Sequence, residues 1–142
     1  MRRFGIKTIV VLALILCVSY AAVGCGDKEQ TAAVINENIE GGVIGEGNTQ
    51  FVLTVIDDKG VATEFTINTD KTTVGDALLD NNIIQGEMGD YGLYVKTVNG
   101  VTADYDTDGT YWAFYIDGEY ATAGVDTTDI VPGTQYTLAV EK

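Results

Sequence analysis

The sequence predicts a small α+β domain of β-grasp type, in which a β-hairpin is followed by one helix and then by further strands. Apolar and polar residues alternate with a period of two in several segments, as in half-buried strands. One segment combines helical spacing with a capping threonine. Asn99-Gly100 and Asp117-Gly118 are dipeptides that suit tight two-residue hairpin turns. We expect this single domain to occupy residues 49–142.

The first expected hairpin joins residues 50–57 to residues 61–67. Phe51, Leu53 and Val55 lie on one side of the first strand, and an Asp-Lys-Gly turn follows it. Each strand therefore has one apolar face that can be buried against a helix.

A short helix is expected from Val74 to Asn82. Thr73 suits the N-cap position, and Asp76 places a carboxylate in the first turn, where the helix dipole favours it. The apolar residues that share one side of this helix are Val74, Ala77 and Leu78. That side is expected to pack on the sheet.

Two further hairpins and a last strand complete the expected domain. Asn99-Gly100 joins residues 91–98 to a brief partner at 101–104, and Asp117-Gly118 joins residues 110–116 to 119–123. Between the expected helix and residue 91 we expect a polar turn. Residues 134–141 form the closing strand.

The N-terminus has the layout of an export signal, predicted as residues 1–24. Three basic residues precede an apolar run from Ile9 to Val18, and small residues follow as far as Gly24-Cys25. The run is shorter than the ~20 residues that a membrane-spanning helix needs. A Cys directly after a small residue resembles the lipobox of bacterial lipoproteins, which implies lipidation at Cys25 and an extracytoplasmic, lipid-anchored protein. The alternative is an ordinary signal peptide followed by a free Cys.

Residues 25–48 are rich in Gly, Glu and Asn and contain no aromatic residue. Such a composition buries too little apolar surface to fold alone. We therefore predict a flexible tether that holds the domain away from the membrane.

The charge of the exported chain excludes several classes of function. From Cys25 onward the chain keeps five lysines against 21 acidic residues, a side-chain charge of −16, and contains neither Arg nor His. Nucleic acid is excluded as a natural partner, because phosphate binding needs a basic surface. Without His, Arg or a free thiol, most catalytic devices are missing. Paired carboxylates could still hydrolyse glycosides, but we expect abundant acids to form a solvated surface and the protein not to be an enzyme.

An acidic segment matches half of a calcium-binding loop. Asp104, Asp106 and Asp108 with Gly109 follow the first six positions of an EF-hand, but position 12 is Tyr115 rather than Glu. The following residues alternate as a strand, so we expect no exiting helix. The three aspartates are a weak calcium candidate, and the favoured interpretation is a polar connecting loop without metal.

The hairpin after this loop is aromatic on both faces. Tyr111, Tyr115 and Tyr120 lie on one face, with Tyr115 opposite Tyr120, and Trp112 and Phe114 lie on the other. A small domain can bury only one such face, so the other should present rings to a flat ligand. The alternative is that the tyrosines are ordinary half-exposed sheet residues.

The order of these motifs resembles the C-terminal β-domain of transcobalamin and intrinsic factor. The shared features are Tyr91-Gly92-Leu93, Val98-Asn99-Gly100, Tyr111-Trp112 and Gly124-Val125-Asp126. The resemblance covers about residues 50–140 and extends to free-standing bacterial lipoproteins with this domain.

The resemblance implies a surface that contacts cobalamin or a related corrinoid, which would be a ligand rather than a resident cofactor. It carries over to these positions: Gly92, Leu93, Tyr94, Trp112, Phe114, Ala121 and Thr122. We expect Trp112 and Phe114 beside the ligand and the Tyr115–Tyr120 pair behind them. The large helical domain that completes the site in those carriers has no counterpart in these residues. We therefore expect shallow binding, or a site completed by another subunit.

The sequence thus predicts a membrane-anchored binding lipoprotein that captures a corrinoid for uptake and passes it to a transporter. The rival prediction is a cell-surface module that contacts a protein or a glycan and has no small-molecule ligand.

Overall fold

The first hairpin forms where the alternation predicts it. In the computed structural model, which describes residues 38–142, β2 (Thr49–Ile56) pairs antiparallel with β3 (Ala62–Thr69). Phe51, Leu53 and Val55 are buried along β2, as predicted. The predictions for residues 1–37, including the signal peptide and Cys25, lie outside the described residues.

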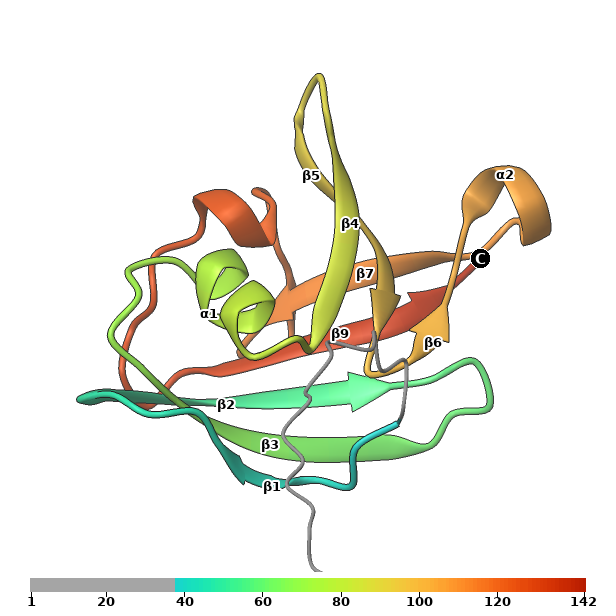
Figure 1. The fold of residues 1–142 in the computed structure, drawn as a ribbon. Coiled ribbons are helices and arrows are strands. Elements are labelled where there is room, and N and C mark those ends of the chain that lie inside the picture. Colours follow the sequence, from blue (N-terminus) through green and yellow to red (C-terminus); the bar gives the residue numbers. More distant parts are fainter. Residues whose placement is uncertain (1–37) are drawn as a thin grey trace, which may run out of the picture. The chain divides into compact units, whose positions relative to one another are not determined.

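The last strand of the chain lies in the middle of the main sheet. β9 (Gln135–Glu141) pairs parallel with β2 and antiparallel with β7 (Tyr111–Ile116). With β8 (Glu119–Tyr120) and β1 (Gly42–Ile44) at its edges, this six-stranded sheet has the order β1-β3-β2-β9-β7-β8. It forms the lower layer in Figure 1.

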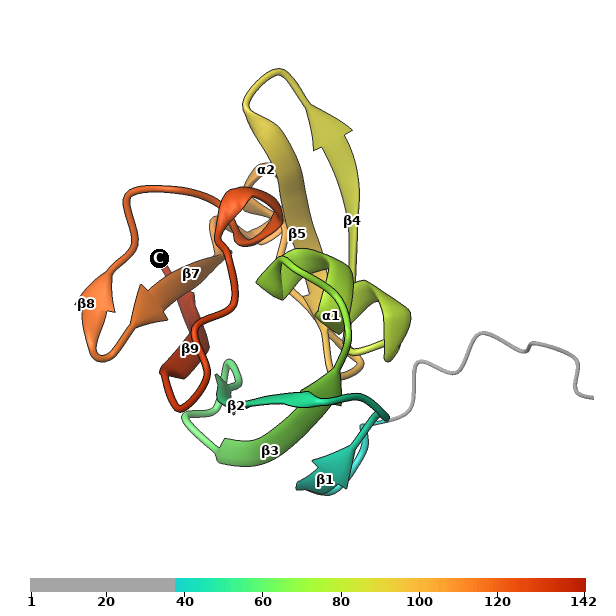
Figure 2. The same ribbon diagram turned by 90° about the vertical axis from the view of Figure 1, so that its left-hand side faces the viewer.

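One face of the main sheet is covered by α1 (Val74–Asp80), which begins at the predicted N-cap. The Thr73 hydroxyl accepts a hydrogen bond from the Asp76 amide at 3.2 Å. The helix ends at its C-cap Asn81, slightly before the expected Asn82. A short 3₁₀ helix, η1 (Val125–Thr127), lies beside α1 (Figure 2).

A second sheet of three strands has the order β4-β5-β6: β4 (Ile84–Gly89), β5 (Gly92–Val98) and β6 (Val101–Thr102). The β4–β5 hairpin stands away from the main sheet in Figure 1. β4 occupies residues expected to form a polar turn, so that expectation is wrong. The pairing of its glycines and acids with β5 through backbone hydrogen bonds overrides their low strand propensity.

Both predicted dipeptide turns have the required backbone. Asn99 and Gly100 have φ of 46° and 81°, and Asp117 and Gly118 have φ of 49° and 85°. Positive φ at both central residues identifies type I′ turns, whose twist matches that of the flanking strands.

The acidic connection between β6 and β7 contains a short helix, α2 (Tyr105–Asp108), where an irregular loop was expected. Gly109 ends it in the left-handed conformation, with φ of 74°.

The core lies between the main sheet, α1 and the base of the second sheet. Its largest fully buried side chains are Tyr136, Phe51, Phe65, Leu53, Ile67 and Leu78. The domain is therefore mixed α+β, mostly β-sheet with two helices, as the α+β prediction requires. Within residues 38–142, the structure contains no helix long and apolar enough to cross a membrane.

Residues 38–47, here called the strap, pack against the domain. Gly42–Ile44 form β1, which pairs in parallel with β3. The Asn99 side chain accepts from the Ile39 amide at 2.8 Å and donates to the Ile39 carbonyl at 3.1 Å and to the Asn38 side chain at 2.8 Å. The prediction of a flexible tether over residues 25–48 is therefore wrong for the strap. For the residues before 38 it stays a prediction.

Candidate functional site

Three of the predicted contact residues, Gly92, Leu93 and Tyr94, lie at the start of β5 on the outstanding hairpin. Leu93 is half-buried against the core, and Tyr94 is exposed. The tip of this hairpin also exposes Met88 and Tyr91, and the Tyr91 side chain is fully accessible. The hairpin thus offers apolar and aromatic surface beside the predicted contacts.

Asp126 fastens the hairpin to η1. Its Oδ2 accepts a hydrogen bond from the Leu93 amide at 3.2 Å. A Cβ on Gly92 would lie 2.7 Å from the same oxygen, so the residue before Leu93 has to be glycine for this contact to form. On the other side, a Cβ on Gly75 of α1 would lie 2.8 Å from the Asp126 Cα. α1, η1 and β5 therefore meet at Asp126.

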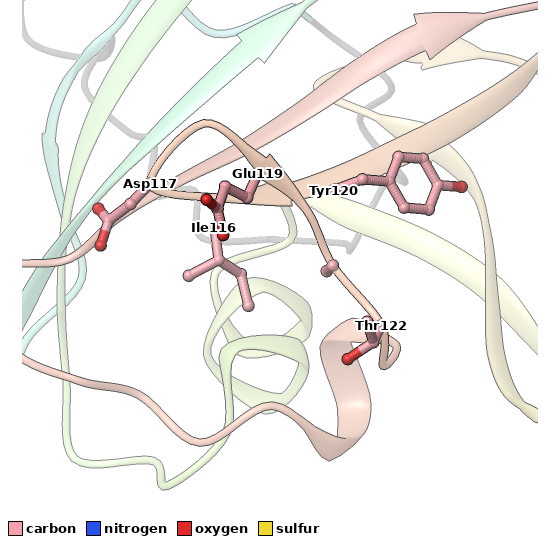
Figure 3. A pocket seen from close by; sticks show the side chains of 6 residues that line it. Ile116, Asp117, Glu119, Tyr120 and Thr122 are labelled. Atoms are coloured by element: carbon pink, nitrogen blue, oxygen red, sulfur yellow. The ribbon is translucent and has the colours of Figure 1, made fainter.

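Ala121 and Thr122 follow β8, at the other end of the segment that leads to η1. The Ala121 amide donates to the Phe114 carbonyl at 2.9 Å, and the Thr122 side chain is exposed. Both residues line an open hollow of about 520 Å³, shown in Figure 3. Its other lining residues are Ile116, Asp117, Glu119 and Tyr120.

The predicted contacts fall into two groups. One group is Gly92 to Tyr94 beside Asp126, and the other is Ala121 and Thr122 in the hollow. The segment that ends in η1 joins the groups, since Asp126 is only four residues beyond Thr122. The lining of the hollow includes none of the β5 residues.

Trp112 and Phe114 do not present their rings to solvent, so that expectation is wrong. Their side chains are only 7% and 8% exposed and belong to the core. The Phe114 ring stacks on Tyr136 with centroids 6.0 Å apart. Inner-facing positions of β7 are buried because α1 and the second sheet cover that face of the main sheet. The Trp112 indole N–H has no hydrogen-bond partner within residues 38–142.

The tyrosine face of the hairpin is the accessible one. Tyr115 and Tyr120 form the predicted cross-strand pair, with ring centroids 5.4 Å apart at 82°. The Tyr115 hydroxyl donates to the Glu141 carboxylate. That hydrogen bond, with partial desolvation and the nearby negative charge, raises the pKa of Tyr115 to about 12. A hydrogen bond to Tyr120 likewise raises the pKa of Tyr111.

Two of the three aspartates of the calcium candidate, Asp104 and Asp108, are occupied by local contacts. Asp104 is the N-cap of α2, accepting from the Asp106 amide at 3.1 Å, and it pairs with Lys96 at 3.5 Å. Asp108 accepts hydrogen bonds from both the amide and the hydroxyl of Thr110, which lower its pKa. Among residues 38–142, no group of three acidic, His or Cys side chains is placed to hold a metal ion.

Replacing Asp104, Asp106 and Asp108 together by Asn is expected to leave the fold nearly unchanged. Asn caps helices about as well as Asp, and a partly exposed surface ion pair such as Asp104–Lys96 contributes about 1 kcal/mol. Thermal melts with and without millimolar calcium check this. A rise of several degrees in the wild-type melting temperature, absent from the triple variant, would show that the loop binds calcium.

Alkaline pH is expected to remove stability through Tyr115. Its folded pKa lies near 12, above the ordinary value of 10.0, so its contribution is intact below pH 10 and is lost as pH rises toward 12. Tyr115→Phe should show a smaller loss over that interval, whereas Tyr94→Phe should behave like wild type. Denaturant melts at several pH values, with ultraviolet titration of tyrosinate, measure both. Equal pH dependence of all three proteins would contradict the assignment.

Solved structures of other proteins share this fold. One is the crystal structure of a candidate metal-binding protein from Ruminococcus gnavus ATCC 29149, with 29% identity and a TM-score of 0.64 over 67% of this chain and 98% of that one. Another is haptocorrin in complex with Cbi, with 20% identity and a TM-score of 0.50 over 66% of this chain. The aligned residues cover 25% of the haptocorrin chain, and the similarity shows the fold alone.

A comparison with curated protein sequences finds no match. Residues 71–142 match the family described as a domain of unknown function, DUF4430. The matched part begins just before α1 and includes Asp126, the hollow and all the predicted contacts. Since it is just over half of the sequence, the chain belongs to the DUF4430 family.

Proposed function

We propose that this chain is an extracytoplasmic binding lipoprotein that captures cobalamin or another corrinoid and passes it to a transporter. Lipidation at Cys25 would anchor it to the bacterial cell membrane. We propose a binding role rather than an enzymatic one, because the sequence has no His and few other groups suited to proton transfer or nucleophilic attack.

The observation that carries the proposal is the connection made by Asp126. It joins the hairpin residues Gly92 and Leu93 to the segment that begins with Ala121 and Thr122. A flat ligand laid across this segment would meet backbone groups and small side chains on both sides. Uncharged amide hydrogen bonds and apolar contacts are what a corrinoid requires from such a surface.

The proposed contact set differs from the original expectation at two residues. Gly92, Leu93, Tyr94, Ala121 and Thr122 remain as contacts. Trp112 and Phe114 form the buried layer behind them, where they hold β7 in place. The fold similarity to haptocorrin, whose structure was solved in complex with Cbi, supports the proposal. The β-grasp-like arrangement of the transcobalamin family is part of the proposal. Because the surface is open, a transporter or second subunit is proposed to complete the site.

The test is the titration of cobalamin and of cobinamide into the full chain. Trp112 is the only tryptophan and is buried near the surface, so quenching of its fluorescence reports corrinoid binding. Thr122→Phe, which places a large ring in the hollow without adding a second tryptophan, is expected to weaken binding at least about tenfold without unfolding the protein. Tyr105→Ala, an exposed change on α2, is the matched control. Failure of the well-folded wild type to bind either corrinoid would overturn the proposal.

One observation favours the rival function. The β4–β5 hairpin exposes Met88 and Tyr91 at its tip, beyond the predicted ligand contacts. Exposed aromatic and Met side chains on a projecting hairpin are typical of surfaces that contact another protein. If Tyr91→Ala leaves corrinoid binding unchanged, the tip is not part of the corrinoid surface and stays available for the contact that the interaction-module prediction assigns to this protein.

A further inference from the structure

Three tyrosines and a glutamate gather on the outer face of β7, β8 and β9, away from the core. Tyr111 lies opposite Glu141 in the β7–β9 ladder, and Tyr115 lies opposite Tyr120 in the β7–β8 ladder. Tyr115 interacts electrostatically with the other three, so the four groups form one cluster. We call Tyr111, Tyr115, Tyr120 and Glu141 the tyrosine cluster.

The floor of the tyrosine cluster is a pair of alanines. Ala113 and Ala139 are cross-strand partners between the Tyr111–Glu141 row and the row of Tyr115. They face outward by alternation, yet they are only 1% and 8% exposed. The Tyr115 side chain crosses this pair to reach Glu141. Because these two residues are small, the Tyr115 ring can lie flat over the sheet instead of projecting into solvent.

Two rings meet there at nearly a right angle. The Tyr115 and Tyr120 rings are inclined by 82° with centroids 5.4 Å apart, an edge-to-face contact. It leaves a corner bounded by the free face of one ring and the uncovered part of the other ring's face. The Tyr120 side chain is exposed and points away from Ile116 and Thr122 of the hollow in Figure 3. A ligand in the angle between the two rings would therefore lie on the side of Tyr120 away from Ile116 and Thr122, although Tyr120 borders the hollow as well.

The polar groups of the cluster limit what such a ligand can be. The hydroxyl hydrogens of Tyr111 and Tyr115 are already engaged, by Tyr120 and by Glu141. Few donors remain for the hydroxyl groups of a sugar, whereas the ring faces and the carboxylate charge remain available. Among residues 38–142, no lysine forms an ion pair with Glu141. The whole chain carries a net charge of −13, which also favours a cation.

We propose that the tyrosine cluster binds a quaternary ammonium group, with the Tyr115 and Tyr120 rings as walls and Glu141 as the counter-charge. Aromatic faces attract such cations through the ring quadrupole. A primary ammonium needs up to three acceptors in exchange for its water shell, and one Glu141 oxygen is already used by Tyr115. A quaternary ammonium needs none. This site lies on the opposite face of β7 from the core, and it does not depend on corrinoid binding.

The direct test is to titrate the full chain into choline and follow the N-methyl proton resonance by NMR. Ring currents are expected to move this resonance upfield as the methyl groups enter the angle between the rings. Ethanolamine, a primary amine, and 3,3-dimethyl-1-butanol, the uncharged isostere of choline, are the comparison ligands. Each is expected to bind about two- to fivefold more weakly than choline, because a cation–π contact at an exposed site supplies a factor of that size.

Two variants locate the contact. Tyr120→Ala and Glu141→Gln are each expected to weaken choline binding about two- to fivefold. Tyr91→Ala removes an equally accessible tyrosine from the β4–β5 hairpin and is expected to leave binding unchanged. Far-ultraviolet circular dichroism of each variant shows whether it is folded. Tyr115→Phe keeps the ring and frees the Glu141 oxygen that its hydroxyl engages, so this variant is expected to bind choline at least as tightly as wild type. It tests the role of the carboxylate if Glu141→Gln does not fold.

Three results would overturn the proposal. One is the absence of an upfield shift with folded wild type at tens of millimolar choline. Another is equal binding of choline and its uncharged isostere, which would assign the effect to apolar contact alone. The third is unchanged binding by Tyr120→Ala, which would place the cation elsewhere. Loss of corrinoid binding in the separate titration would not affect any of them.

Discussion

Replacing Phe114 by alanine is expected to lower the free energy of unfolding by about 3–5 kcal/mol, as truncation of buried phenylalanines generally does. The ring is 8% exposed and stacks on Tyr136, which itself packs edge-on against Phe51. Removing it leaves a cavity in the core beside Tyr136. In a domain of this size the loss is a large share of the total stability. Denaturant melts followed by Trp112 fluorescence measure it.

Tyr91→Ala is the matched control for this truncation. It also removes an aromatic ring, but from a fully accessible position, so its effect should stay within about 0.5 kcal/mol. Corrinoid titrations of both variants distinguish a ring that packs in the core from a ring that contacts the ligand. If Phe114→Ala melts like wild type and loses corrinoid binding, Phe114 faces the ligand and our assignment of it to the core is wrong.

The error about Phe114 and Trp112 shows what a period of two can and cannot tell. Alternation correctly sorted the side chains of β7 into two faces, and the Asp-Gly turn fixed the Tyr115–Tyr120 pair, because both are local properties. Which face is buried depends on β9, α1 and the second sheet, and β9 inserts between β7 and β2 from the end of the chain. The aromatic residues of β7 do not by themselves indicate which face these distant elements cover.

β4 was missed for a different reason. Its sequence, IQGEMG, has no alternation and carries two glycines, both unfavourable for a strand in isolation. In the structure a bulge falls between Gln85 and Gly86, and a Cβ on Gly86 would lie 2.2 Å from the Tyr94 carbonyl oxygen. The glycine is there because the two backbones approach closely, a requirement visible only once β5 is in place.

The structure connects segments that the motif order left separate, while the ligand contacts themselves stay a prediction. The motif order placed Gly92, Leu93, Ala121 and Thr122 in the two segments that η1 connects. Asp126 was noticed as part of a motif but was given no role, because its partner, Leu93, is 33 residues away. Contacts over such separations depend on the packing of α1 against η1, which periodicity and turn chemistry do not specify.

Glycine content misled the interpretation of the strap. Its glycines indicated flexibility by composition, yet several lie where a side chain would collide with the domain. A Cβ on Gly41 would lie 2.3 Å from the Glu64 carbonyl oxygen, and one on Gly47 would lie 2.1 Å from the carbonyl carbon of Thr69. The strap therefore uses glycine to approach β3 closely. The tether of the proposed lipoprotein would accordingly leave the domain near the β5–β6 turn, where Asn99 holds Asn38 and Ile39.

Gly45→Ala is expected to detach the strap. The residue has φ of +79°, which costs an alanine about 1–2 kcal/mol. The added Cβ would also lie 2.3 Å from the Asn68 carbonyl oxygen, and relieving such overpacking costs about 1–3 kcal/mol more. β1 has only three residues to hold it against β3, so the crowding should be released by separation of β1. Amide hydrogen exchange at Val43 and Ile44 is expected to accelerate more than about tenfold.

Gly60→Ala separates the two causes. Gly60 has almost the same backbone conformation, with φ of +81°, but a Cβ there would meet nothing within 4 Å. Each Gly→Ala change restricts the unfolded chain and disfavours positive φ to the same extent. The difference between the two variants in β1 hydrogen exchange therefore measures the cost of the close approach to β3. Gly60→Ala should leave exchange in β1 unchanged and cost only the backbone strain. If Gly45→Ala behaves in the same way, the strap is not packed on β3 in solution, and its glycines provide flexibility, as their composition first indicated.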